Sequence, residues 1–241
     1  MTNEQREWEI EAYPLLLAEV RSALGRRKLV TAAVPGAPRD MLAFTSKTLP
    51  LILESVDFLN VMTYEMLNRR DNITKHHGGK ALSRESLETY IAAGAPPDRL
   101  NLGFAFQLKY ARTEHKRCFE NPIGCPTLLL EDPETGADLG NIGAFAWADE
   151  PPAEVRASCL KAIRNGQYDN QGGGWYYWDA DESLWWSYET PFSIRDKFNL
   201  VRDLGLGGVF AWELGADGPE YSRLAALNDA VVGWGSKKDE H

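Results

Sequence analysis

Short apolar runs alternate with amphipathic segments along the chain. The run Val56–Met62 is apolar and β-branched on both faces, which is typical of a buried strand. It is followed by Tyr64 and Glu65, and a second short run, Gly207–Trp212, is followed by Glu213. Each run alone could equally be an ordinary core strand. In α/β proteins, however, ligands are bound at the carboxyl ends of such strands, so these residues are candidates for a binding site.

The other periodic segments predict further strands and flanking helices. Two more strands are expected at Lys28–Val34 and Leu100–Phe106. Helices are expected at Thr2–Gly25, with a kink or break at Pro14, and at Asp40–Leu53, Ser83–Ala93, Ser193–Leu204 and Pro219–Val231. Strands and helices that alternate at these spacings favour right-handed βαβ crossovers in a parallel sheet, and therefore an α/β fold.

Roughly 100 residues separate the predicted strands Leu100–Phe106 and Gly207–Trp212, which is too long for a bare connection. Within this stretch, short strands are expected at Leu128–Glu131, Gly143–Trp147 and Trp175–Trp178, and a helix at Pro152–Arg164.

Composition narrows the possible partners. The chain has 241 residues, 44% of them hydrophobic, which suits one globular domain with room for an inserted subdomain. Its formal net charge is −9 and it contains no basic run, so we expect no nucleic-acid partner and no anionic membrane surface. No apolar stretch approaches the roughly 20 residues that span a bilayer.

Cysteine and histidine give weak signals. Cys118 and Cys125 bracket a turn and could form a disulfide, which would leave Cys159 without a cysteine partner.

Adjacent side chains on regular backbone point in different directions, so we expect His76 and His77 to lie in a flexible loop rather than at a metal site. No cofactor motif is evident, and the first residues lack the apolar core of a signal peptide.

Two motifs resemble family 18 glycoside hydrolases, the chitinase family. They are Met62-Thr63-Tyr64-Glu65, where the family has Met-x-Tyr-Asp, and Gly207-Gly208-Val209-Phe210-Ala211-Trp212, which matches Gly-Gly-x-x-x-Trp. The resemblance extends from about Trp8 to about Leu227. It implies part of a TIM-type (β/α)8 barrel, strands five to eight, over residues 1–241, with a small α+β insertion at 110–177.

The resemblance also assigns roles to individual residues. Tyr64 would act in catalysis by hydrogen-bonding the acetamido group of the sugar and steadying an oxazolinium-like intermediate. Met62 would lie on the pocket floor and Trp212 under the distorted sugar ring. Glu65 replaces the family's Asp, so its added methylene is expected to disturb fine positioning. Glu213 could contact hydroxyl groups or be a rim charge.

The family's catalytic acid is not found in this chain. It ends the motif Asp-x-x-Asp-x-Asp-x-Glu, and that spacing does not occur here. The acidic cluster at 179–182 has a different spacing and reads as a solvated turn. We expect the motif strand to precede Thr2, which leaves open a truncated gene model, a split gene or a degenerate protein. Trp178, Trp185 and Trp186 could form a stacking platform, although core packing is the commoner fate of such residues.

The sequence therefore predicts a chitinase-like glycoside hydrolase for N-acetylglucosamine polymers such as chitin, with a substrate-assisted retaining mechanism. Alone, the chain is expected to be inactive. The alternatives are a non-catalytic carbohydrate-binding protein and a fragment without an independent fold. A homodimer could cover the open barrel edges. By analogy, a full-length family member would be extracellular. An esterase is disfavoured because no Gly-x-Ser-x-Gly elbow is present.

Overall fold

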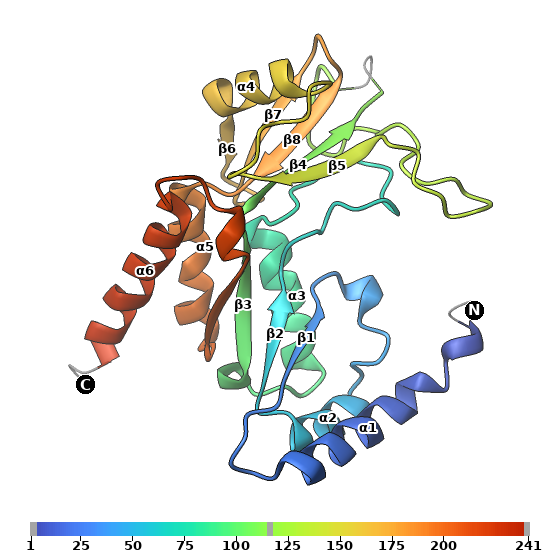
Figure 1. Ribbon diagram of the computed structural model, residues 1–241, viewed down its shortest axis with the longest axis vertical. Coiled ribbons are helices and arrows are strands. Elements are labelled where there is room, and N and C mark those ends of the chain that lie inside the picture. The colour runs from blue at the N-terminus through green and yellow to red at the C-terminus, as the bar shows by residue number, and fades with distance from the viewer. Residues whose placement is uncertain (1–3, 115–117, 239–241) are drawn as a thin grey trace. The chain divides into compact units, whose positions relative to one another are not determined.

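The computed structural model describes residues 4–114 and 118–238 (Figure 1). Thr2, where the first predicted helix was expected to begin, lies outside the described residues. The chain divides into two compact units. The first comprises Met1–Thr63, Ser83–Gly103 and Leu200–Phe210, and the second comprises Tyr64–Leu82, Phe104–Asn199 and Ala211–His241.

The described elements alternate in type along the first unit and become mainly β in the second. The helices are α1 (Glu9–Leu24), α2 (Thr48–Ser55), α3 (Lys80–Ala92), α4 (Arg156–Asn165), α5 (Pro191–Leu204) and α6 (Ser222–Lys238). The strands are β1 (Thr31–Pro35), β2 (Phe58–Met62), β3 (Leu100–Ala105), β4 (Gln107–Arg112), β5 (Ile142–Ala146), β6 (Gln167–Asp169), β7 (Gly174–Asp179), β8 (Leu184–Tyr188) and β9 (Gly208–Trp212).

The first unit is built on a sheet with the strand order β1-β2-β3-β9. Strands β1, β2 and β3 are parallel, and Val34 pairs with Val61 while Leu59 pairs with Leu100. These four side chains are buried, whereas the residues that alternate with them in β1 and β2 are exposed or half-buried, so these two strands bury one face. The four strands of the sheet lie within a few residues of the predicted runs.

Gly207 and Gly208 have a packing role at the start of β9. A Cβ atom on Gly207 would lie 2.1 Å from the carbonyl oxygen of Asp98, and one on Gly208 would lie 3.1 Å from Oδ1 of Asn101. Gly207 also donates a backbone hydrogen bond of 3.0 Å to the carbonyl of Leu100. A glycine is therefore needed at 207 for β9 to approach the start of β3 this closely, whereas at 208 the Asn101 side chain would have to shift by a few tenths of an ångström.

Helices α1 and α2 pack against each other in the first unit. Arg21 of α1 donates to the carbonyl of Ser55 at 2.8 Å and to the Asp57 carboxylate at 2.5 Å. Asp57 also accepts the backbone N–H of Val30, and together these bonds hold the pKa of its carboxyl below the usual range. Of the kink or break predicted at Pro14, a break is wrong, since α1 continues through this residue, and a kink stays a prediction.

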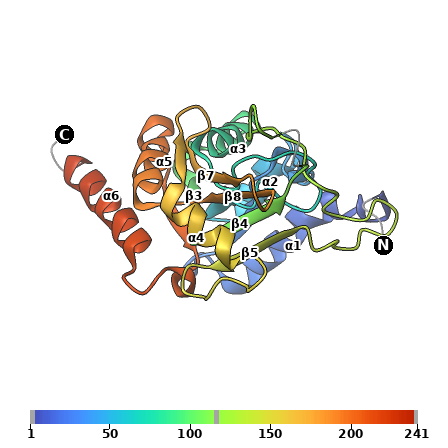
Figure 2. The same ribbon diagram turned by 90° about the horizontal axis from the view of Figure 1, so that it is seen from above.

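The second unit contains an antiparallel sheet with the order β5-β4-β8-β7-β6. Helix α4 lies against one face of this sheet, as Figures 1 and 2 show. Cys159 and Ala162 of α4 are buried there with Leu108, Leu184 and Trp186. Strands β4, β6 and β8 were not predicted.

The second unit tests three expectations, of which one is wrong. Leu128–Glu131 is not a strand, because only Glu131 makes an isolated bridge, to Asp138. His76 and His77 lie in a loop, as predicted, but they are buried, with His76 4% exposed and His77 fully buried; the flexibility of the loop stays a prediction. Trp185 and Trp186 are fully buried in the sheet and cannot form a stacking platform. Core packing, which was the favoured interpretation, is confirmed for these two residues.

The structure is thus an α/β fold whose described strands form two open sheets and not a closed barrel. The identification of β1, β2, β3 and β9 as barrel strands five to eight stays a prediction, as does the assignment of 110–177 as an insertion. Among the described residues, no helix is long and apolar enough to cross a membrane.

Candidate functional site

Tyr64 is the first residue of the second unit and follows β2 by two positions. Its side chain is buried, with 7% exposed. Burial, and then the neighbouring charge of Glu65, raise the pKa of the Tyr64 phenol to about 12. The hydroxyl therefore keeps its proton at neutral pH and can donate a hydrogen bond.

Glu65 is fixed by two side chains from β4. Its backbone is left-handed, with φ of 57°, which is uncommon for a non-glycine residue. Its carboxylate accepts a hydrogen bond of 2.6 Å from Gln107 Nε2 and another from the Lys109 ammonium. Gln107 and Lys109 are two residues apart on β4 and so point to the same face of the strand.

Trp212 ends β9 and presents its indole to solvent, with 56% of the residue exposed. Its carbonyl accepts the backbone N–H of Phe106 at 2.8 Å. The peptide bond to Glu213 is cis, and the Glu213 side chain is exposed. Trp212 thus offers an accessible aromatic face whose backbone is held by the residue that precedes β4.

The segment Phe106–Lys109 brings the two sequence motifs together. Phe106 holds the backbone of Trp212, while Gln107 and Lys109 hold the side chain of Glu65. Met62, by contrast, is a half-buried residue at the end of β2 in the first unit. Tyr64, Glu65, Trp212 and Glu213 all belong to the second unit.

Sequence reasoning missed several residues that support this site. Gln107 and Lys109 alternate with apolar residues after Phe106, and this period-two pattern was the available signal. Glu189 and Lys197 form a buried ion pair with 2.9 Å between Oε1 and Nζ. Their separation in sequence gave no indication of this pairing.

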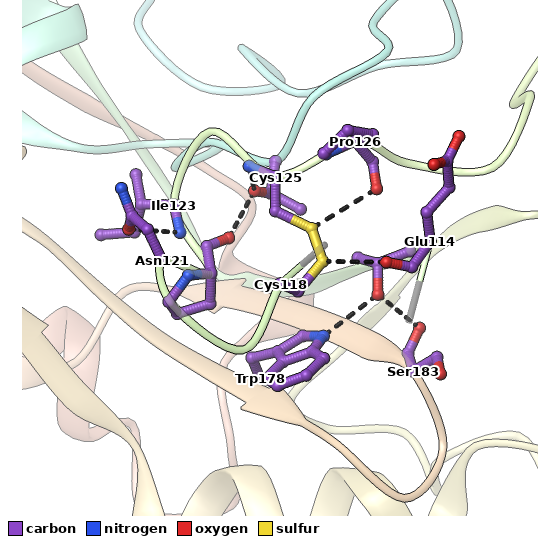
Figure 3. Close-up of a disulfide and its surroundings, with 11 residues drawn as sticks. Glu114, Cys118, Asn121, Ile123, Cys125, Pro126, Trp178 and Ser183 are labelled. Atoms are coloured by element: carbon purple, nitrogen blue, oxygen red, sulfur yellow. Dashed lines mark hydrogen bonds between the residues drawn. A yellow bond between two sulfur atoms is a disulfide. The ribbon is translucent and has the colours of Figure 1, made fainter. Parts of the chain in front are cut away.

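Cys118 and Cys125 are joined by a disulfide (Figure 3). Near the disulfide, the Trp178 indole N–H donates a hydrogen bond of 3.0 Å to Thr113 Oγ1. The rings of Phe119 and Trp178 pack edge to face, with 5.0 Å between their centroids. Cys159 is a free, buried thiol. In the described parts of the chain, no group of three or more His, Cys, Asp or Glu residues is placed to hold a metal ion.

Known proteins resemble this chain in sequence. Chitinase 63 of Streptomyces plicatus is 23% identical over 237 residues, which is 91% of this chain and 34% of that protein. Nod factor hydrolase protein 1 of Medicago truncatula is 25% identical over 200 residues, which is 78% of this chain and 47% of that protein. The chain therefore spans about a third to a half of these relatives.

Solved structures share the fold. The chitinase of Rhizomucor miehei has a TM-score of 0.72 at 22% identity, covering 90% of this chain and 65% of its own. A mutant of the class V chitinase of Nicotiana tobaccum, in complex with NAG4, has a TM-score of 0.69 at 20% identity, covering 92% of this chain and 64% of its own. The chitinase-like agglutinin of Robinia pseudoacacia has a TM-score of 0.61 at 19% identity, covering 93% of this chain and 62% of its own.

The family comparison covers most of the chain. Residues 2–217 match the sequence model of the family described as glycosyl hydrolases family 18. This range contains both motifs and every residue of the candidate site. The chain belongs to glycosyl hydrolase family 18.

Proposed function

We propose that the chain contributes one part of a chitinase-like site for N-acetylglucosamine polymers. Tyr64 and Trp212 are the residues that contact the sugar, with Glu65 and Glu213 as their sequence neighbours in the second unit, and Met62 is a further candidate binding residue in the first unit. The catalytic acid of the Asp-x-x-Asp-x-Asp-x-Glu motif comes from outside this chain. The chain alone is accordingly inactive in hydrolysis.

The observation that carries this proposal is the convergence of both motifs on Phe106–Lys109. A sugar needs an apolar surface for its C–H face and hydrogen-bond donors for its polar groups. Trp212 offers an exposed ring, and Tyr64 offers a hydroxyl that stays protonated at neutral pH. Family membership and the NAG4 complex of the Nicotiana enzyme support the same sugar class.

The proposed chemistry divides between the substrate, this chain and the missing acid. In a substrate-assisted retaining reaction, the acetamido oxygen of the sugar attacks the anomeric carbon. The Tyr64 hydroxyl donates to the acetamido group as charge develops there. The leaving glycosidic oxygen takes its proton from the acid that this chain lacks, so binding without turnover is expected.

Titration calorimetry with chitohexaose tests the binding proposal. Trp212→Ala should weaken affinity by at least about fivefold, since ring stacking contributes of the order of 1 kcal/mol beyond area burial. Trp8→Ala is the matched control, because Trp8 is 65% exposed and lies outside both motifs. Absence of heat with the wild-type chain would contradict the proposal. Hydrolysis by the pure chain that is lost in Tyr64→Phe would contradict the missing acid.

A non-catalytic carbohydrate-binding protein is the alternative. The fold likeness to the chitinase-like agglutinin of Robinia pseudoacacia favours this alternative, because an agglutinin is a protein that binds and cross-links its ligands. The two readings differ when the missing motif is supplied. A chain fused to a family segment with Asp-x-x-Asp-x-Asp-x-Glu should hydrolyse chitohexaose under the first reading and only bind it under the second.

The proposed architecture is a half barrel with an insertion at 110–177, whose open edge is covered by a second copy of the chain. Strand β1 lies at the edge of its sheet, and Thr31 and Ala33 are exposed there. Ala33→Lys should weaken such pairing, because edge lysines oppose strand addition. Sedimentation velocity should then show a dimer for the wild type and a monomer for the variant; a wild-type monomer would contradict the dimer.

A further inference from the structure

Glu189 and Lys197 are charged residues in the interior of the second unit. Their side chains are 4% and 1% exposed, and the Lys197 ammonium lies 4.9 Å from the centroid of the Phe104 ring. A buried ion pair contributes little net stability, because desolvating two charges offsets their attraction. Such a pair is therefore better explained by the arrangement that it specifies.

The Glu189 carboxylate reaches the backbone beside Trp212. Its Oε2 accepts the N–H of Ala105 at 2.7 Å while Oε1 is bound by Lys197. The next N–H along the chain, that of Phe106, donates to the carbonyl of Trp212 at 2.8 Å. The carboxylate thus binds the peptide unit that directly precedes the one holding Trp212.

The Glu189 backbone is linked to Asp217, at the far end of the segment 212–217 that begins with Trp212. Its carbonyl accepts Arg223 Nε at 3.0 Å, and Arg223 Nη1 binds Asp217 Oδ1 at 3.1 Å. The Arg223 guanidinium also lies 3.5 Å from the centroid of the Trp147 ring. Asp217 Oδ2 accepts the backbone N–H of Leu224, which ties the end of the loop to α6.

We infer that Glu189, paired with Lys197 and linked to Arg223, is a positioning residue that sets the path of residues 212–217 and so the orientation of the Trp212 ring. A half-exposed indole has few contacts of its own to fix it, so its direction depends on its backbone. The importance of that direction for sugar binding rests on the proposed function.

Fluorine NMR of protein labelled with 5-fluorotryptophan tests the inference without any sugar. The Trp212 resonance is assigned by its loss in Trp212→Phe. Glu189→Gln and Lys197→Met should shift or split this resonance and leave those of Trp185 and Trp186 in place. Lys80→Met is the matched control, because it removes a 2.9 Å ion pair with Asp196 of the same helix α5.

Two results would overturn the inference. One is an unchanged Trp212 resonance in both variants; the other is a joint movement of all tryptophan resonances, which would indicate general loosening. The double variant Glu189→Leu/Lys197→Met covers the case in which single variants do not fold, since an apolar pair can replace a buried ion pair. It should fold and still displace the Trp212 resonance; a wild-type resonance would overturn the inference.

A double-mutant cycle on chitohexaose affinity connects the two proposals. If Lys197 acts through Trp212, Lys197→Met should weaken binding severalfold in the wild-type background and have no effect in Trp212→Ala. Additive losses would overturn the positioning role in binding. A wild-type chain that binds no chitohexaose would overturn the proposed function, while the fluorine spectra would still decide the orientation of Trp212.

Discussion

The Lys109 ammonium donates a hydrogen bond to the carboxylate of Glu65, the residue that follows Tyr64. The Lys109 side chain is 9% exposed and that of Glu65 is 38% exposed, so Glu65 is the group that screens a largely buried cation. The resemblance places an aspartate at this position in the family. The added methylene of Glu65 can therefore be understood as reach toward β4, where Gln107 binds the second carboxylate oxygen.

Glu65→Asp should destabilise the protein, because the shorter side chain cannot keep both partners on β4. Leaving a buried cation without its partner costs about 1–3 kcal/mol. Urea unfolding measures the loss. Glu9→Asp is the control, since Glu9 makes an exposed ion pair with Arg6 and should change stability little. A Glu65→Asp variant as stable as the wild type would show that Lys109 does not depend on Glu65.

Tyr64 should ionise later than an ordinary tyrosine. Subtracting the alkaline absorbance at 295 nm of Tyr64→Phe from that of the wild type isolates this phenol. With a pKa of about 12, it should give about a tenth of a tyrosinate signal at pH 11. The unfolded chain loses this proton first, so Tyr64 makes stability fall as pH rises above about 10. A midpoint near pH 10 would mean that the phenol is solvated.

The histidine pair should make the protein less stable in mild acid. Burial lowers the pKa of His76, against the opposing effect of its hydrogen bond to the Asp169 carboxylate. Burial, together with the charges of Lys109 and Lys197, lowers the pKa of His77 well below its usual value. Below about pH 6.5 the two histidines therefore bind protons in the unfolded chain but not in the folded chain, so the free energy of unfolding falls as the pH drops. Each histidine contributes at most about 1.4 kcal/mol per pH unit.

Unfolding free energies in urea at pH 7.5, 6.5 and 5.5 measure this slope. His77→Leu removes one of the two titrating groups, so its slope between pH 6.5 and 5.5 should be smaller than that of the wild type. An identical slope in the two proteins would locate the acid sensitivity elsewhere.

The turn at 172–174 should not tolerate a side chain at Gly174. A Cβ atom there would lie 2.4 Å from both Cγ and Nδ1 of His76. His76 cannot move away easily, because it is buried and its Nε2 is 3.0 Å from Asp169 Oδ2. Overpacking of this kind costs typically about 1–3 kcal/mol.

Thermal unfolding compares Gly174→Ala with Gly233→Ala. Gly233 lies in α6 with open space around its Cα, so alanine there should be neutral or stabilising. Equal stability of the two variants would mean that the turn is not packed on His76.

The sequence was informative where one local pattern decides the structure. The short apolar run Val56–Met62 predicted a strand, and β2 is found at Phe58–Met62, where Leu59 and Val61 are buried and the residues between them are half-buried. Strand β4 was missed because Gln107, Lys109 and Arg112 dilute its apolar character. The histidine pair was misjudged for a related reason: polar letters predict exposure unless the buried partners, here Asp169 and Ser187, are known.

The site shows the same division. The motifs identified Tyr64 and Trp212, but the residues that hold them come from elsewhere in the chain. Gln107 is 42 residues from Glu65, and Ala105 is 84 residues from Glu189. Local periodicity contains no information on such pairs, because they are created by the way strands are brought together.

The location of the third cysteine has a consequence for oxidative folding. Cys159 lies on the buried face of α4, and burial raises the pKa of its thiol to about 11. Thiolate is the species that attacks disulfides, so in the folded protein Cys159 cannot exchange with the Cys118–Cys125 bond. Scrambled isomers can then arise only while the chain is open. The rate at which a thiol reagent labels Cys159 therefore measures how often the core beneath α4 opens.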